Sequence, residues 1–183
     1  MKWIIASDIH GSEYYCRKLL EAYQRERGDR LLLLGDILYH GPRNDLTLQY
    51  NTKTVAEMLN SKKEQIICVR GNCDSEVDQM VLEFPIMSDY VLLAEGSSTI
   101  FATHGHIYNP HHLPPLYKGD ILLNGHTHIP DCIEYENYVY MNPGSVSLPK
   151  ADSWHGYIVM ENGEFLWKDL SGNLYNIYKH SKP

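Results

Sequence analysis

The sequence predicts an α/β sandwich that forms a single domain over residues 1–183, and three observations support this prediction. In the first half of the chain, short apolar runs alternate with helical stretches, as in a parallel sheet with helical crossovers. In the second half, short apolar runs follow one another across tight turns, which favours a second, mostly antiparallel sheet. A chain of 183 residues also buries about 70% of its unfolded surface on folding, which is enough for such a core.

The first half predicts three strands and two helices. Short runs rich in Ile, Leu and Val, typical of buried strands, occupy residues 3–7, 31–35 and 65–69. The intervening stretches carry apolar residues at helical spacing, which predicts helices over 13–27 and 54–61. The resulting order, β-α-β-α-β, requires crossover helices between parallel strands.

The second half predicts six further strands and no helix. These strands cover residues 99–103, 120–124, 132–135, 138–141, 155–160 and 164–170. Short polar turns join two pairs of them, Glu136-Asn137 in the first case and Asn162-Gly163 in the second. We therefore expect these strands to form the second sheet.

Composition narrows the classes of partner and compartment. The formal net charge is −7, from 23 acidic and 16 basic residues. This charge argues against a binding surface for long nucleic acid but allows small phosphate compounds as ligands. The four cysteines form no Cys-x-x-Cys pair, which fits a reducing compartment. The apolar N-terminal stretch is too short for a signal peptide, and no run approaches the ~18 apolar residues of a membrane span. We expect a cytoplasmic protein without a membrane partner; a homo-oligomer is compatible with the sequence, which does not determine it.

Side chains that can bind ligands or take part in catalysis lie where the predicted strands end. Beginning with the first strand, the residues that follow these ends are Asp8 and His10, then Asp36, Asn72 and His104, and finally His126 and His128. In open α/β sheets, ligands bind outside the carboxyl ends of the strands, so these side chains are expected to share one edge.

Spacing gives a second argument for one site. In an extended segment, residues two apart point to the same side, so Asp8 with His10 and His126 with His128 form two candidate ligand pairs. Taken alone, Asp-x-His is most often a helix N-cap, and Gly-Asp is a common turn. Because Asp, Asn or His recurs at five strand ends, the sequence predicts a metal centre.

These motifs, in this order, resemble the calcineurin-like metallophosphoesterase family, in its small bacterial and archaeal phosphodiesterase branch. The resemblance spans residues 3–150 and rests on Asp8-x-His10, Gly35-Asp36, Gly71-Asn72, His104-Gly105 and Gly125-His126-x-His128. The run Asn142-Pro-Gly-Ser145 is also similar to a loop of this branch. The resemblance implies a four-layer α-β-β-α sandwich of the metallo-dependent phosphatase type.

The resemblance also implies a binuclear metal centre. One ion would be held by Asp8, His10, Asp36 and His128, and the other by Asp36, Asn72, His104 and His126, with Asp36 bridging. Mixed nitrogen and oxygen ligands suit Mn, Fe, Ni, Co or Zn, and family habit favours Mn²⁺. In this reading the protein is a phosphodiester hydrolase, in which water held between the ions attacks phosphorus and no covalent enzyme intermediate forms. Asp36, Asn72 and His104 are then catalytic as well as metal-binding.

Cys73 departs from the family pattern, in which His usually follows the Gly-Asn. Three roles are open to it: a nucleophile, a metal ligand, or a stand-in for the missing His. The third is favoured, because water is the better-placed attacker and a soft thiolate does not suit a hard site. The acid that normally orients the His persists as Asp74. We therefore expect a weakened general acid, so that substrates with poor leaving groups are hydrolysed more slowly.

A second departure concerns the substrate. Phosphatases of this superfamily carry an Arg shortly after Gly-Asp, but the run from Gly35 to Gly41 contains none, and only Arg43 and Arg70 lie nearby. Without an Arg fork for a monoester dianion, a small phosphodiester is the favoured substrate. Two alternatives remain open: a weakly active or inactive binding scaffold, as in the retromer scaffold subunit that resembles this family, and a metal-dependent nuclease.

Overall fold

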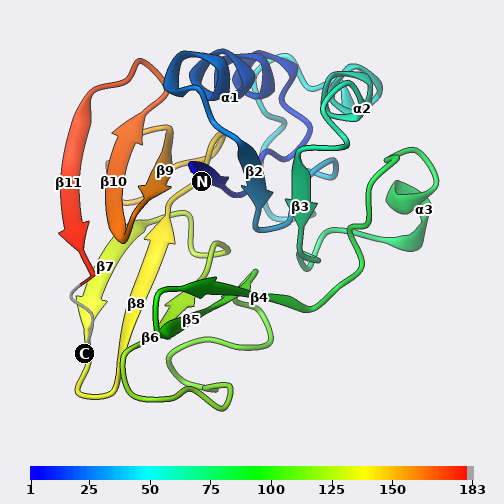
Figure 1. Cartoon of the computed structure of the whole chain (residues 1–183). Helices are drawn as coiled ribbons and strands as arrows, with labels where there is room; N and C mark the ends of the chain where they lie inside the picture. Colours follow the sequence, from blue (N-terminus) through cyan, green and yellow to red (C-terminus); the bar gives the residue numbers. More distant parts are fainter. Residues whose placement is uncertain (181–183) are drawn as a thin grey trace.

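The computed structural model describes residues 1–180, which form two mixed β-sheets with helices beside them (Figure 1). The first sheet has six strands in the order β11-β10-β9-β1-β2-β3, and the second has five in the order β4-β5-β6-β8-β7. The α/β fold with two sheets is thus confirmed. None of the helices in the described range has both the length and the apolar character needed to cross a membrane.

The first half of the chain folds as its sequence pattern predicts. It contains β1 (Trp3–Ala6), α1 (Glu13–Glu26), β2 (Arg30–Leu33), α2 (Thr52–Asn60) and β3 (Ile66–Cys68). β1 pairs with β2 and β2 with β3, both in parallel. Ser12 caps α1 by accepting a hydrogen bond from Tyr15 N, and Asn51 caps α2 in the same way. Both helices therefore begin at residues whose side chains satisfy free backbone N–H groups.

Strands of the second half divide between the two sheets, which corrects the predicted arrangement. The second sheet holds β5 (Ser98–Thr103), β6 (Asp120–Leu123), β7 (Pro130–Glu134) and β8 (Tyr138–Pro143). It is mixed, because β5, β6 and β8 run parallel. By contrast, β9 (Gly156–Glu161) pairs antiparallel with β1, and β10 (Glu164–Asp169) continues the first sheet. An apolar strand pattern shows burial but not which sheet the strand joins.

Three elements have no counterpart in the sequence prediction. α3 (Glu76–Gln79) is a single turn that begins with a capping box formed by Ser75 and Asp78. β4 (Tyr90–Glu95) and β11 (Leu174–Lys179) are edge strands, each paired on one side only. Their partial exposure leaves a weaker alternation of apolar residues than a buried strand carries.

Two apolar cores hold the layers together. α1 and α2 pack against the outer face of the first sheet through residues such as Leu19, Val55 and Leu59. Between the sheets lies a second core that includes Ile5, Leu123 and Trp167, and this core fixes how the sheets face each other. On the outer face of the second sheet, Tyr108 and Leu116 from the connection between β5 and β6 cover a small cluster that includes Phe101. Within residues 1–180 a loop, not a helix, covers this face.

Candidate metal centre

The connections that follow β1 and β2 lie side by side. Asp8 N donates to Gly35 O at 3.1 Å, and His10 N donates to Asp36 O at 2.9 Å. The connection after β6 reaches this point from the second sheet, because His126 N donates to Asp8 Oδ2 at 3.1 Å. The strand ends of the two sheets thus meet at one edge, as the sequence predicts.

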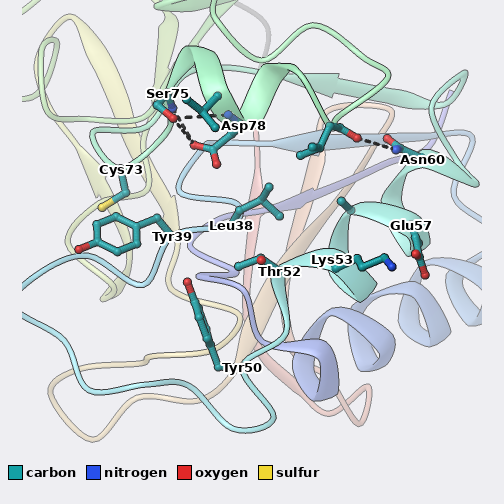
Figure 2. A pocket seen from close by; sticks show the side chains of 13 residues that line it. Leu38, Tyr39, Tyr50, Thr52, Lys53, Glu57, Asn60, Cys73, Ser75 and Asp78 are labelled. Carbon is teal, nitrogen blue, oxygen red and sulfur yellow. Dashed lines mark hydrogen bonds between the residues drawn. The ribbon is translucent and has the colours of Figure 1, made fainter.

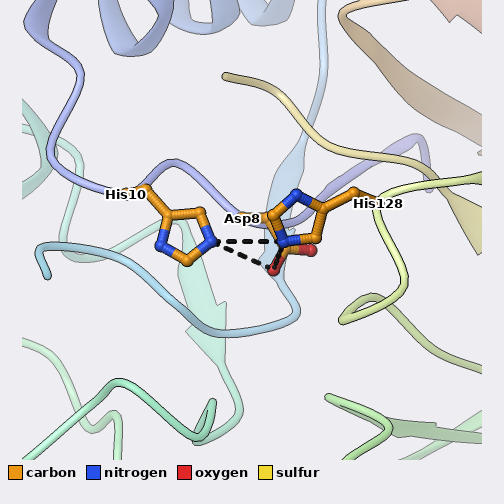
Figure 3. A group of neighbouring side chains, drawn as sticks. All are labelled: Asp8, His10 and His128. Carbon is orange, nitrogen blue, oxygen red and sulfur yellow. Dashed lines mark hydrogen bonds and ion pairs between the residues drawn. The ribbon is translucent and has the colours of Figure 1, made fainter. Parts of the chain in front are cut away.

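Asp8, His10 and His128 form the first ligand group (Figure 3). Asp8 Oδ1 lies 3.2 Å from His128 Nε2 and 3.6 Å from His10 Nε2. The two imidazole nitrogens are 3.3 Å apart. All three side chains are buried, and their ligand atoms face a common point.

The second group is built around His104. Its Nε2 lies 3.0 Å from Asn72 Oδ1, 3.1 Å from His126 Nδ1 and 3.5 Å from Asp36 Oδ2. Asp36 Oδ2 is also 3.7 Å from His10 Nε2, in the first group. The Asp36 carboxylate therefore stands between the two groups.

Backbone carbonyls fix the tautomers of three histidines. His10 Nδ1 contacts Tyr39 O at 2.8 Å, His104 Nδ1 contacts Leu34 O at 2.6 Å, and His128 Nδ1 contacts Leu148 O at 2.7 Å. A carbonyl oxygen only accepts, so each Nδ1 carries the hydrogen and donates it. In the neutral rings, Nε2 then presents its lone pair to the centre of the site, which is the usual arrangement of a metal-ligating histidine.

Five of these residues have left-handed backbone conformations. The φ angles are 60° for Asp8, 47° for His10, 55° for Asp36, 65° for His126 and 63° for His128. Such conformations cost roughly 1–2 kcal/mol per residue and persist only where the surroundings enforce them. The prediction that each pair converges because its segment is extended is therefore wrong. Tight left-handed turns, not strands, aim the side chains inward.

Close backbone approach leaves no room for side chains beside the site. A Cβ atom at Gly71 would overlap the Asp36 carboxylate and its backbone nitrogen. One at Gly125 would overlap Ser7 Oγ and lie 3.0 Å from Asp8 Oδ2. Glycine thus allows close approach within the first sheet at Gly71 and between the two sheets at Gly125.

The atoms that converge in this site are acceptors, and a positive charge among them would stabilise them. Asp8 Oδ1 is buried without a hydrogen-bond partner, and three acceptor atoms of the first group converge within the distances given above. Burial alone would raise the pKa of the Asp8 carboxyl, but contacts with His10 and His128 outweigh it and hold that pKa well below its usual value. Likewise, burial opposes protonation of His104, yet contact with Asp36 raises its pKa to about 9. A divalent cation supplies the required charge, so these residues fit a metal ion.

Cys73 lies beside this site with a protonated thiol. Its backbone N–H donates to Asp36 Oδ1 at 2.8 Å, and its Sγ accepts from Asn72 Nδ2 at 3.2 Å. Burial, together with the charge of Asp36, raises the pKa of the thiol to about 12. A thiol of this kind is a poor nucleophile. Its sulfur nevertheless forms a group with His10 and Asp36 that meets the distances of a metal site.

Asp74 is turned away from Cys73. Its buried carboxylate accepts three backbone hydrogen bonds, from Asp36 N at 2.8 Å, Ile37 N at 2.9 Å and Gly71 N at 2.7 Å. Both oxygens are thus occupied by the loops that carry Asp36 and Asn72. The carboxylate holds those loops together and has no hydrogen bond to the side chain at position 73.

Several residues besides the predicted ligands contribute to the site. The hydroxyls of Ser145 and Ser147 donate to Asp8 O at 2.9 and 3.0 Å, and so hold the left-handed turn at Asp8. Ser145 closes the Asn-Pro-Gly-Ser run, which was the available signal. Lys150 and Arg43 line a cavity of about 350 Å³ that includes Asp36, Asn72 and His126. No sequence signal distinguishes Lys150 from an ordinary surface lysine, and Arg70 does not line this cavity.

Comparisons with known proteins agree with this architecture. Residues 1–164 match the calcineurin-like phosphoesterase superfamily domain. Phosphodiesterase YfcE of Escherichia coli K12 is 44% identical over 162 residues, which covers 88% of each chain. A solved structure of YfcE, a phosphoesterase from E. coli, superposes with a TM-score of 0.95 at 39% identity, covering 99% of this chain and 100% of the other.

More distant relatives share the fold. A probable metallophosphoesterase of Bacillus subtilis, YsnB, is 25% identical over 167 residues, covering 87% of this chain and 83% of its own. The crystal structure of Vps29 from Chaetomium thermophilum superposes with a TM-score of 0.66 at 16% identity, with both chains fully covered, which is a likeness of fold alone. On the match to the family model and the identity to YfcE, the chain belongs to the calcineurin-like phosphoesterase superfamily.

Proposed function

We propose that this protein is a phosphodiesterase that works through two divalent metal ions. The observation that carries the proposal is the position of Asp36, whose Oδ2 lies within 3.7 Å of His10 Nε2 and 3.5 Å of His104 Nε2. A carboxylate between two groups of acceptors is the arrangement that lets one residue bridge two cations. The 44% identity to phosphodiesterase YfcE supports the reaction class.

Each ligand group would hold one ion. Asp8, His10, Asp36 and His128 make the first set, and Asp36, Asn72, His104 and His126 make the second. Bound there, divalent ions would lower the pKa of water and offset the charge of a phosphate group, and we propose Mn²⁺ as the native metal. The carbonyl contacts of His10, His104 and His128 orient the rings for this role without movement on binding.

Substrate charge favours a diester. Lys150 and Arg43 line the cavity beside Asp36, and no ion pair with an acidic residue involves either of them within residues 1–180. Both are exposed single cations and not a buried guanidinium fork. The site thus lacks the bidentate guanidinium grip that suits a monoester dianion, which favours a phosphodiester.

Position 73 limits which esters react well. A thiol is a weak hydrogen-bond donor, so Cys73 is a poorer proton donor to a leaving alkoxide than an imidazolium would be. Esters with good leaving groups need little proton donation, so they should react well. Replacing Cys73 with His should raise turnover of alkyl diesters by at least about tenfold while changing that of nitrophenyl diesters less.

Hydrolysis of bis-p-nitrophenyl phosphate by metal-stripped protein, with and without Mn²⁺, tests the function. Turnover that requires metal and exceeds that of the p-nitrophenyl monoester is expected. Asp36→Ala and Asn72→Ala should abolish it, whereas Asp29→Ala and Asn162→Ala, matched changes at exposed positions, should not. No turnover by folded protein with any divalent ion would exclude the enzyme and favour a binding scaffold; full activity in Asp36→Ala would overturn the ligand assignment.

A further inference from the structure

A second and larger cavity adjoins the candidate metal centre. It has a volume of about 610 Å³ and lies among α2, α3 and the connection that follows β2 (Figure 2). We propose that this side cavity binds one organic arm of the diester, and that the arm carries a flat aromatic group. The proposal rests on the phosphodiesterase function proposed above and names the class of substrate.

The side cavity adjoins the site at Cys73. Cys73 lines both the side cavity and the smaller cavity that contains Asp36, Asn72 and His126. Tyr39 joins the two regions as well, because its carbonyl accepts the hydrogen bond from His10 Nδ1 while its ring lines the side cavity. A phosphate at the metal centre would therefore lie on one side of Cys73, with the side cavity on the other.

Aromatic rings form the wall nearest the site. Tyr39 lies edge-on to His40, with ring centroids 4.8 Å apart, and His40 lies edge-on to Tyr50 at 5.2 Å. The Tyr50 ring packs against Gly11, where a Cβ atom would come within 2.5 Å of it. Close packing thus holds the Tyr50 ring in place, while Tyr39, 41% exposed, forms the outer part of the wall. A planar group can stack or pack edge-on against such a wall, which adds to the gain from apolar burial.

Apolar side chains complete the middle of the side cavity. Leu38 and Ala56 are almost fully buried at its floor, and Val81 stands at its rim with 51% of its surface exposed. Ligand cavities of this kind typically measure about 300–1,000 Å³ and combine apolar walls with a few polar groups. The volume is far larger than a methyl or ethyl ester needs.

Unused polar groups lie at the far end. Lys53 and Glu57 line the end opposite Cys73 (Figure 2), and neither side chain has an ion pair or hydrogen bond within the described part of the chain. Three other polar side chains that line the side cavity are already hydrogen-bonded. Ser75 and Asp78 bond each other, and Asn60 bonds the backbone of Val81 and Glu83. The arm that fits has an aromatic body near the phosphate and polar substituents at its outer end.

Ligand binding tests the proposal without relying on turnover. Diphenyl phosphate and dimethyl phosphate carry the same charge and differ only in their arms. NMR titration of the Zn²⁺-loaded protein should give at least about tenfold tighter binding of the diphenyl ester, since burial of the extra carbons is favourable. The largest amide shifts should include Tyr50, Lys53 and Val81. Equal affinities, or shifts confined to the metal centre, would overturn the proposal.

A matched pair of variants locates the effect. Val81→Trp fills the rim of the side cavity, while Met80→Trp adds the same ring at a neighbouring position that is 84% exposed and does not line the cavity. The preference for the diphenyl ester should vanish in Val81→Trp and persist in Met80→Trp. The methyl ester of thymidine 5′-phosphate, titrated alongside, separates a nucleoside base from a simple aryl ring. If the wild-type protein showed the aryl preference but no metal-dependent turnover of any diester, the phosphodiesterase function would be refuted. The side cavity would then still be an aryl-binding site.

Discussion

Replacing Asp74 with Asn tests whether this carboxylate acts on the loops of the site. Asp74 Oδ2 accepts from Asp36 N and Gly71 N, and Oδ1 accepts from Ile37 N. The Asn oxygen can keep the first two bonds, but its amide then turns a donor toward the N–H of Ile37. One charge-assisted bond is lost and one buried N–H is left unpaired, so we expect a loss of about 2–4 kcal/mol in the free energy of unfolding.

The same change should weaken metal binding. Asp36 sits in a left-handed conformation with φ of 55°, and the bond from its backbone to Asp74 helps to hold it there. Groups that orient a metal ligand typically change metal affinity by about 10–100-fold. The Mn²⁺ concentration for half-maximal turnover should therefore rise by that factor, while saturating Mn²⁺ restores much of the rate.

Urea unfolding and Mn²⁺ titration of the Asp74→Asn protein measure both effects. Repeating them in a Cys73→Ala background separates two roles for Asp74. If Asp74 acts through the backbone, the two substitutions should be nearly additive. The reasoning is refuted if Asp74→Asn costs less than about 0.5 kcal/mol, or if its effect on activity disappears once Cys73 is removed.

Three further predictions follow from the geometry of the site. Gly71→Ala should cost about 1–3 kcal/mol in stability and sharply reduce metal-dependent turnover, because its Cβ would overlap Asp36; Gly163→Ala, where the nearest atom lies 3.5 Å away, should leave turnover intact. At pH 8, iodoacetamide should alkylate Cys73 of the metal-free protein much more slowly than it alkylates a free thiol, because a raised pKa lowers the thiolate fraction. Cys73, with a pKa of about 12, should also react more slowly than Cys132, with a pKa of about 11. Quantitative mass spectrometry that finds Cys73 as reactive as glutathione would contradict this. Mn²⁺ at about 100 times its dissociation constant should stabilise the fold by about 2.7 kcal/mol at one site, seen as a rise in Tm on calorimetry, and the absence of any rise would count against metal binding.

The sequence predicts which side chains come together at one edge better than it predicts the topology. Apolar runs at 3–7 and 31–35 correspond closely to β1 and β2, since these strands are buried and bounded by polar turns. The strands β9 and β10 were placed in the wrong sheet, because β9 pairs with the distant β1, which no local pattern encodes, and β10 pairs with β9.

Local chemistry explains what could and could not be foreseen at the site. His126 and His128 were recognisable because two imidazoles so close together have few structural uses. The left-handed turns at Asp8 and Asp36 were not foreseen, because they depend on distant partners: Ser145 donates to Asp8 O, and Asp74 accepts from Asp36 N. Lys150 was missed since only its position in the folded chain sets it apart from other exposed lysines.

Each ligand group draws its side chains from both sheets. In the first, Asp8 and His10 follow β1 and His128 follows β6; in the second, Asn72 and Asp36 belong to one sheet and His104 and His126 to the other. The apolar core joins the sheets in the interior, but at this edge they meet through buried carboxylates and imidazoles, and Asp8 Oδ1 there has no hydrogen-bond partner. A bound cation would cross-link the two sheets at this edge. Fraying of the two sheets at this edge and release of the metal would then be one and the same event.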